Sequence, residues 1–242
     1  MVQGALQQFL ESSMTGQTEE PFWRLFFRLD LAVATVLGCS PLVGSRHWDR
    51  VSGFSPAAGE GEISTPLQLL ASAFSLSNAA LETAQPAGAL WAEVWTALQL
   101  WHRRRAEHML PIVSCGTVEA GQIDLSSASL PIELYSSAQA LLSNATYHFA
   151  SLILLSSRPR LVKPPPSGSR QALSVSWHMQ SIVGMATQNA FETSQWDPIL
   201  IAALIYVSPR LTHHSQREVL QSCLTRAEKA TGLYALTAEG RT

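Results

Sequence analysis

Apolar residues recur every three or four positions along most of the chain, and this helical spacing limits the possible fold more than any other feature. No long stretch alternates between apolar and polar residues, and only residues 113–125 suit a short strand. The sequence holds no repeat of fixed length, and 242 residues suffice for one large domain. We therefore predict an all-α single domain over residues 1–242, folded as an irregular bundle of about seven to nine helices.

Capping residues indicate where the last two helices begin and end. Asp197 suits an N-cap and Pro198 the first helical position after it. Ser215 and Glu218 form a capping-box pattern, and Gly232 is the expected end of that helix. Both helices are therefore predicted with defined starts.

Prolines and glycines give the other boundaries. The earlier helices are expected at about 21–37, 66–81, 86–108, 131–157 and 171–192. Between and before them we expect a tail or short helix at 1–20, a loop at 40–64 and a proline-rich connector at 158–170. In the first helix, the residues expected to face the core are Leu25, Leu29, Ala32, Val33 and Val36.

Composition and motif content exclude several classes of protein. Hydrophobic residues make up 46% of the chain and charged residues only 14%, while a net charge of −2 gives no attraction to DNA or anionic lipid. The three cysteines lie far apart, so neither a zinc site nor a disulfide framework is expected, and a reducing intracellular compartment is the simplest setting. The apolar run over residues 198–207 is too short to span a membrane. We expect no metal and no cofactor, and the sequence lacks the common motifs of phosphate, dinucleotide, zinc-protease and serine-hydrolase sites.

The most basic stretch of the chain is "WHRRRAEHML", residues 101–110. At 100° per residue, Trp101 and Arg105 fall on the apolar stripe of their helix, whereas Arg103 points away and Arg104 points to the side. The three arginines therefore spread around the axis, which favours the basic last turn of an ordinary helix over a phosphate-binding patch. A role in a pocket stays open for Arg105 and His102.

Histidines and tryptophans supply the other candidate site residues. His148 lies on the apolar face of its helix. It is therefore either a core residue or a group that contacts a ligand or transfers a proton. His178 is expected to be exposed or at a helix contact. The tryptophans at 91, 95 and 101 form a ladder that suits either core packing or the aromatic wall of a ligand site. Arg28 borders an apolar stripe and needs a buried acidic or carbonyl partner.

Five stretches, in order, resemble one protein family: "FFRLDLAVATVLG", "WTALQLWHRRRAEHMLPI", "YHFASLILLSSRP", "MQSIVGMATQNAFETSQWDPILIAALIYV" and "REVLQSCLTRAEKATGLY". Over roughly residues 21–235 the chain is similar to the all-helical regulatory domain of fungal transcription regulators of the zinc binuclear cluster type. The resemblance implies control of transcription, often of secondary-metabolite genes, through binding of a small molecule or a protein partner. The six-cysteine DNA-binding module of that family is absent from this sequence, so direct binding to nucleic acid is not expected.

Three hypotheses follow for the function. The first is a regulator-like domain acting in the nucleus, with a small-molecule site formed by Trp91, Trp95, Trp101, His102, Tyr147 and His148. The second is a cofactor-free cytoplasmic isomerase or cyclase for an aromatic or polyketide-type metabolite, with His148 or His102 as acid–base and Arg28 or Arg105 stabilising negative charge. The third is a subunit that pairs with a full regulator or with a second copy of itself.

Overall fold

The structure is a computed structural model, and it describes residues 20–43, 61–82, 87–115, 130–160, 162–163, 171–189 and 196–233. The helices are α2 (Glu20–Leu37), α4 (Gly61–Glu82), α5 (Ala87–Arg104), α6 (Ala138–Ser156), α7 (Val175–Gln188), α8 (Pro198–Val207) and α9 (His214–Thr231). Short 3-10 helices span Glu107–Met109, Gln171–Leu173 and Ser208–Arg210, and the strands are β1 (Val113–Cys115) and β2 (Ile132–Leu134). The predicted all-α fold is confirmed.

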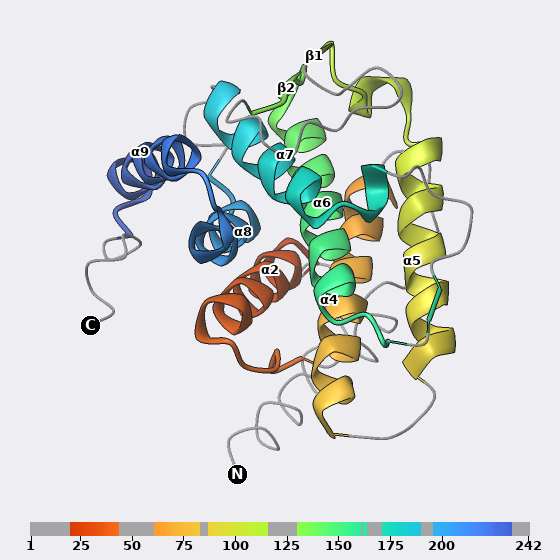
Figure 1. Ribbon diagram of the computed structural model, residues 1–242. Helices are drawn as coiled ribbons and strands as arrows, with labels where there is room; N and C mark the ends of the chain where they lie inside the picture. Colours follow the sequence, from red (N-terminus) through yellow and green to blue (C-terminus); the bar gives the residue numbers. More distant parts are fainter. Residues whose placement is uncertain are drawn as a thin grey trace.

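Helix α6 forms the centre of the bundle (Figure 1). Between Ala140 and Leu154 every side chain except that of Leu142 is buried. A helix buried on all sides lies inside a core, and α6 accordingly packs against α4, α5, α7 and α8. The polar side chains of α6 therefore need partners inside the protein.

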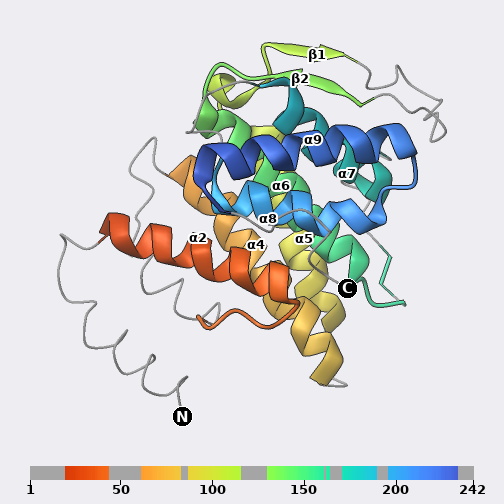
Figure 2. The ribbon, with the colours of Figure 1, turned by 90° about the vertical axis from the view of Figure 1, so that its left-hand side faces the viewer.

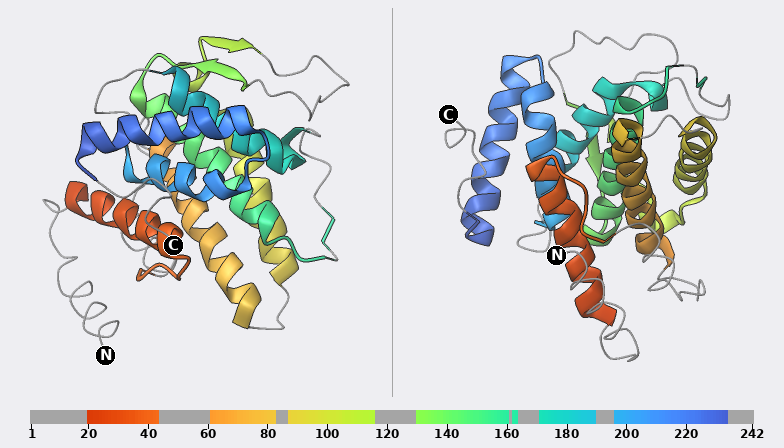
Figure 3. Two further views of the ribbon diagram at one scale, coloured as in Figure 1. Left: turned by 60° about the vertical axis from the view of Figure 1, so that its left-hand side comes forward. Right: turned by 90° about the horizontal axis from the view of Figure 1, so that it is seen from below.

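The remaining helices lie on two sides of α6. Helices α4 and α5 lie on one side, and α8 lies on the other with α2 and α9 beside it (Figures 1 and 3). Helix α9 is outermost and crosses over α8 and α7 (Figure 2). This arrangement buries α8, whose sequence "PILIAALIYV" is almost wholly apolar. No helix in the described ranges is long and apolar enough to cross a membrane.

The β1–β2 hairpin corrects the prediction of a helix that starts at residue 131. The two strands pair antiparallel, with Val113 opposite Leu134 and Cys115 opposite Ile132, so the strand expected within 113–125 is confirmed at its start. Helix α6 begins only at Ala138, where the Ser137 side chain accepts a hydrogen bond from the Ala140 N–H. The hairpin depends on tertiary contacts that local periodicity does not contain.

The predicted core face of α2 is wrong for three of its five residues. Leu25, Leu29 and Val33 are exposed, whereas the buried face carries Phe27, Leu31, Ala32 and Ala34. Helix α2 has apolar residues on two faces; it packs against α8, and the face that carries Phe27 is the buried one. Gly38, with φ of 65°, ends the helix as expected.

Other boundaries differ by a few residues. Helix α4 starts at Gly61 and contains Pro66, α5 stops at Arg104 rather than at 108, and the N-cap of α9 is His213 instead of Ser215. The fifth helix is split into a 3-10 turn and α7, which starts after the N-cap Ser174. Most of the expected tail at 1–20, of the loop at 40–64 and of the connector at 158–170 lies outside the described residues, and the last four residues of the expected loop belong to α4.

Candidate functional site

Six ring side chains from three helices meet beside α6. We call them the aromatic–histidine cluster, and its members are Trp101 and His102 of α5, Tyr147 and His148 of α6, and Trp177 and His178 of α7. Helices α5 and α7 both pack on α6, and each contributes a histidine–tryptophan pair of neighbours in sequence. The cluster thus unites four of the six predicted ligand-binding residues.

The rings lie in close, ordered contact. The imidazole of His102 stacks on the phenol ring of Tyr147, with centroids 4.2 Å apart and planes at 14°. His148 presents its ring nearly at right angles to Tyr147, at 5.0 Å, and packs at 4.7 Å against Trp177. Tyr147, His148 and His178 are almost fully buried, while Trp101, His102 and Trp177 are partly exposed. The cluster therefore extends from the core to the surface.

Hydrogen bonds fix the tautomers of the two buried histidines. Nε2 of His178 lies 2.9 Å from the carbonyl oxygen of Ala172, so this nitrogen carries the proton and donates it. In a neutral ring Nδ1 of His178 is then the acceptor, and Nδ1 of His148, 3.0 Å away, must be the donor. Nε2 of His148 is left as a lone pair inside the cluster.

Burial holds all three imidazoles in the neutral form. It lowers the pKa of His102 to about 3, with the charge of Arg105 adding to the effect, as does that of His178 once it is protonated. It lowers the pKa of His178 to about 4 against the opposing hydrogen bond to Ala172, and it lowers the pKa of His148 well below the usual 6.5. At neutral pH the cluster holds hydrogen-bonding imidazoles without charge.

A polar group adjoins the cluster at the end of α5. Arg105 donates from a guanidinium N–H to the carbonyl oxygen of His102, and its side chain is partly buried. Burial lowers the pKa of Arg105, against the raising effect of Tyr135, Glu133 and Tyr147. The carboxyl of Glu133 accepts a hydrogen bond from the Tyr135 hydroxyl at 3.0 Å, and burial raises the pKa of Glu133. One cation and one carboxyl thus share a largely buried region.

Three donors in this region have no partner among the described residues. They are Nε2 of Gln99, Nε of Arg105 and Nε1 of Trp177. Gln99 is only 4% exposed, and its Oε1 accepts a hydrogen bond from the Tyr147 hydroxyl at 3.3 Å. Because an unpartnered buried donor costs about 1–3 kcal/mol, the three together indicate a place for added acceptors.

The predicted site residues Trp91 and Trp95 lie further along α5 and outside the cluster. Their indoles stack at 5.5 Å and 7°, and Nε1 of Trp91 donates to the carbonyl oxygen of Leu154 at 2.8 Å. Both indoles are fully buried. For this pair the core-packing interpretation holds.

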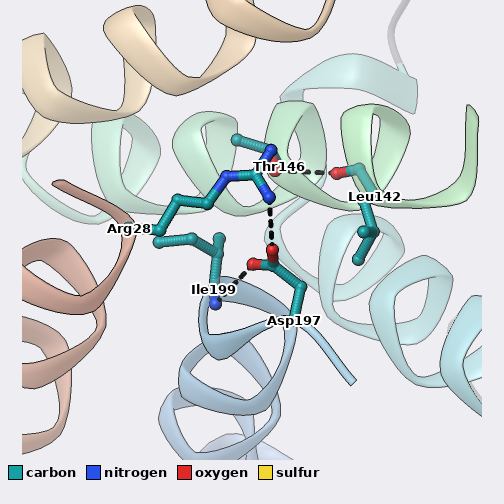
Figure 4. A network of polar contacts seen from close by, with 5 residues as sticks. All are labelled: Arg28, Leu142, Thr146, Asp197 and Ile199. Carbon is teal, nitrogen blue, oxygen red and sulfur yellow. Dashed lines mark hydrogen bonds and ion pairs between the residues drawn. The ribbon is translucent and has the colours of Figure 1, made fainter. Parts of the chain in front are cut away.

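Arg28 also lies apart from the cluster, on a different face of α6. Its guanidinium donates to Asp197 at 2.7 Å, so the predicted acidic partner is confirmed (Figure 4). The other carboxylate oxygen of Asp197 accepts from the Ile199 N–H at 2.8 Å, as the predicted N-cap requires. A cavity of about 10 Å³ beside the pair, next to Ser143 and Thr146, is about as large as one water molecule needs. Arg28 therefore ties α2 to α8.

Sequence reasoning placed Arg105 inward, Arg103 outward and Arg104 to the side; Arg105 is partly buried, whereas Arg103 and Arg104 are both exposed. It missed Gln99, Glu133 and Trp177, and it left open an exposed His178 that is in fact fully buried. Gln99 has a detectable signal, because it lies three residues before His102 and four after Trp95 on one helix face. Glu133 has none, because its burial depends on the hairpin.

Within the described part of the chain, no three His, Cys, Asp or Glu side chains lie together as a metal ion requires. Comparisons with protein-family models, with curated proteins and with solved structures find no match to this chain. The geometry of the cluster therefore carries the functional argument.

Proposed function

We propose that this chain is a regulator-like helical domain that binds a small molecule at the aromatic–histidine cluster. In this proposal another module or a partner protein contacts DNA in the nucleus. Binding of the ligand to this domain then alters the transcription of genes, and the sequence resemblance implies genes of secondary metabolism. The observation that supports ligand binding is the set of unpartnered donors at Gln99, Arg105 and Trp177.

The donors favour a ligand over simple core packing. Unpartnered polar atoms also occur elsewhere in the core, as at Nε1 of Trp95, so it is the setting of these three donors that favours a ligand. Here the donors adjoin flat rings, three of which are partly exposed and offer a path from solvent. A few directed polar groups within aromatic walls are typical of small-molecule sites.

Ligand binding can be measured by thermal unfolding of the full chain with a panel of neutral and anionic aromatic compounds. A ligand at one hundred times its Kd adds about 2.7 kcal/mol, which raises Tm by several degrees. Replacing Gln99 by Leu, which removes this donor together with the acceptor of the Tyr147 hydroxyl, should reduce the shift for any compound that binds. If no compound in the panel raises Tm, the binding part of the proposal is wrong.

The regulatory part needs a separate readout. The full chain is fused to an unrelated DNA-binding module, and reporter expression is measured with and without a compound that binds in vitro. We expect expression to change with dose, and we expect the Gln99→Leu fusion to respond only at higher dose. A fusion that binds the compound but leaves expression constant would contradict the regulatory role.

The isomerase or cyclase is the second candidate, and the lone pair on Nε2 of His148 favours it. The depressed pKa of His148 counts against it, because a general base works best with a pKa near the ambient pH. Incubation followed by mass spectrometry and NMR separates the two: a sensor returns its ligand unchanged. Turnover that is lost in His148→Ala would make the enzyme the better assignment.

A further inference from the structure

Resting on the proposed ligand-binding function, we infer the chemical class of the ligand. We propose that the site takes a planar aromatic carboxylate, whose carboxylate oxygens accept hydrogen bonds from Nε of Arg105 and Nε2 of Gln99. The ring of the ligand packs beside Trp101, His102 and Tyr147.

The cation at the site lacks a direct counter-ion. No ion pair joins Arg105 to a carboxylate among the described residues, where Arg28 has Asp197 and His214 has Glu218. Glu133 is close enough for its charge to act on Arg105, but its carboxyl is engaged by the Tyr135 hydroxyl. A partly buried guanidinium with a free N–H is a strong binding group for a carboxylate.

The neighbouring groups favour one negative charge over two. The three imidazoles are neutral, and Arg105 is the arginine whose charge acts on His102 and His148. A phosphate or a dicarboxylate would place its second charge near the Glu133 carboxyl, and a second like charge in a buried site is unfavourable. A monocarboxylate matches the single guanidinium.

The walls favour a flat ligand. His102 and Tyr147 are already stacked at 4.2 Å, and the Trp101 ring lies 5.9 Å from Tyr147 at a tilt of 31°. Trp101, His102 and Arg105 are all partly exposed and adjoin the end of α5, so a ligand enters from that side. The partly exposed rings of Trp101 and His102 offer aromatic surface on which another ring can pack.

The test uses isothermal titration of the full chain with 2-naphthoate, its neutral counterpart 2-naphthamide, and the non-planar cyclohexanecarboxylate. We expect 2-naphthoate to bind at least about tenfold tighter than either comparison compound, since a charge-assisted pair contributes about 1.4 kcal/mol or more. Equal affinities for 2-naphthoate and 2-naphthamide would overturn the carboxylate, and equal affinities for the two acids would overturn the flat ring.

Matched arginine variants locate the effect. Arg105→Gln should bring 2-naphthoate to the affinity of 2-naphthamide, whereas Arg104→Gln, at the exposed neighbouring position, should change neither. If Arg105→Gln folds and still prefers 2-naphthoate to 2-naphthamide, the assignment is contradicted. If Arg105→Gln does not fold, Arg105→Lys takes its place, since it keeps the charge but lacks Nε. We expect Arg105→Lys to lose part of the preference for the acid, and no loss would contradict the assignment. If neutral aromatics bind and acids do not, the inference fails alone; if nothing binds, the proposed function fails as well.

Discussion

Nδ1 of His148 and Nδ1 of His178 lie 3.0 Å apart inside the protein, and the proton between them belongs to His148. The order follows from the carbonyl oxygen of Ala172, which can only accept from Nε2 of His178. His178 must therefore be neutral for the chain of hydrogen bonds to exist, because its Nδ1 has to accept. Protonation of His178 at Nδ1 would place two donors face to face in a buried site.

Acid should destabilise the protein through this pair. The pKa of His178 falls from 6.5 in the unfolded chain to about 4 in the native one, so between these values only the unfolded chain binds the proton. The contribution of His178 to the free energy of unfolding is therefore fully present above pH 6.5 and decreases as the pH falls toward 4. At pH 5 the loss from this residue is about 2 kcal/mol. Urea unfolding at pH 7.5 and 5.0 measures the loss.

His178→Gln should reduce that loss, because the amide can still donate to Ala172 without titrating. Thr187→Ala removes a side-chain hydrogen bond to Val183 on the same helix and serves as a control for reduced stability alone. The control should keep the full difference between the two pH values. A His178→Gln protein with the same difference would show that this histidine is not the source.

The Arg28–Asp197 pair should contribute strongly because Asp197 has two functions. Asp197→Ala removes both the ion pair and the cap on Ile199, and we expect a loss of about 2–4 kcal/mol. Asp197→Asn keeps a good capping residue and should lose only about half as much. The exposed His214–Glu218 pair supplies the control, since Glu218→Gln should change stability by less than about 0.5 kcal/mol. Equal losses of unfolding free energy in the two Asp197 variants would show that the cap does not contribute to stability.

The two faces of α2 should differ sharply in their tolerance to truncation. Leu31 is 1% exposed and Leu29 is 44% exposed, although both are leucines of one helix. Leu31→Ala should lose about 2–5 kcal/mol and Leu29→Ala less than about 1 kcal/mol, measured by urea unfolding. Similar losses of unfolding free energy in the two variants would contradict the burial of the Leu31 face and the exposure of the Leu29 face.

This helix shows why some features could be predicted from sequence and others could not. The caps at Asp197 and Gly232 depend on a few adjacent residues, and both were predicted correctly. The face of α2 depends on which of two apolar faces meets α8, which no local pattern contains.

In the candidate site, too, features of a single helix could be predicted from the sequence, whereas features that depend on packing between elements could not. Arg105 was placed inward by its phase within α5, a property of one helix. His178 was expected to be exposed or at a helix contact, and the contact with His148 of α6, which buries it fully, depends on how α7 packs on α6. Burial of Glu133 depends on Asn189, which donates to the Glu133 carbonyl oxygen and accepts from the Tyr135 N–H, more than fifty residues away.

Gly184 should be intolerant of even one added carbon. A Cβ built at this position of α7 would lie 2.3 Å from the carbonyl oxygen of Pro131, and backbone at that distance cannot move aside without shifting the hairpin. Alanine in a helix normally gains about 1 kcal/mol over glycine, but overpacking here should outweigh it and give a net loss of about 1–3 kcal/mol. Gly88→Ala is the matched control, because its Cβ would meet only a side-chain methyl of Val162, at 2.7 Å, which can yield. Thermal unfolding should rank Gly184→Ala well below Gly88→Ala, and the reverse order would mean that α7 and β2 are not packed as closely as the structure has them.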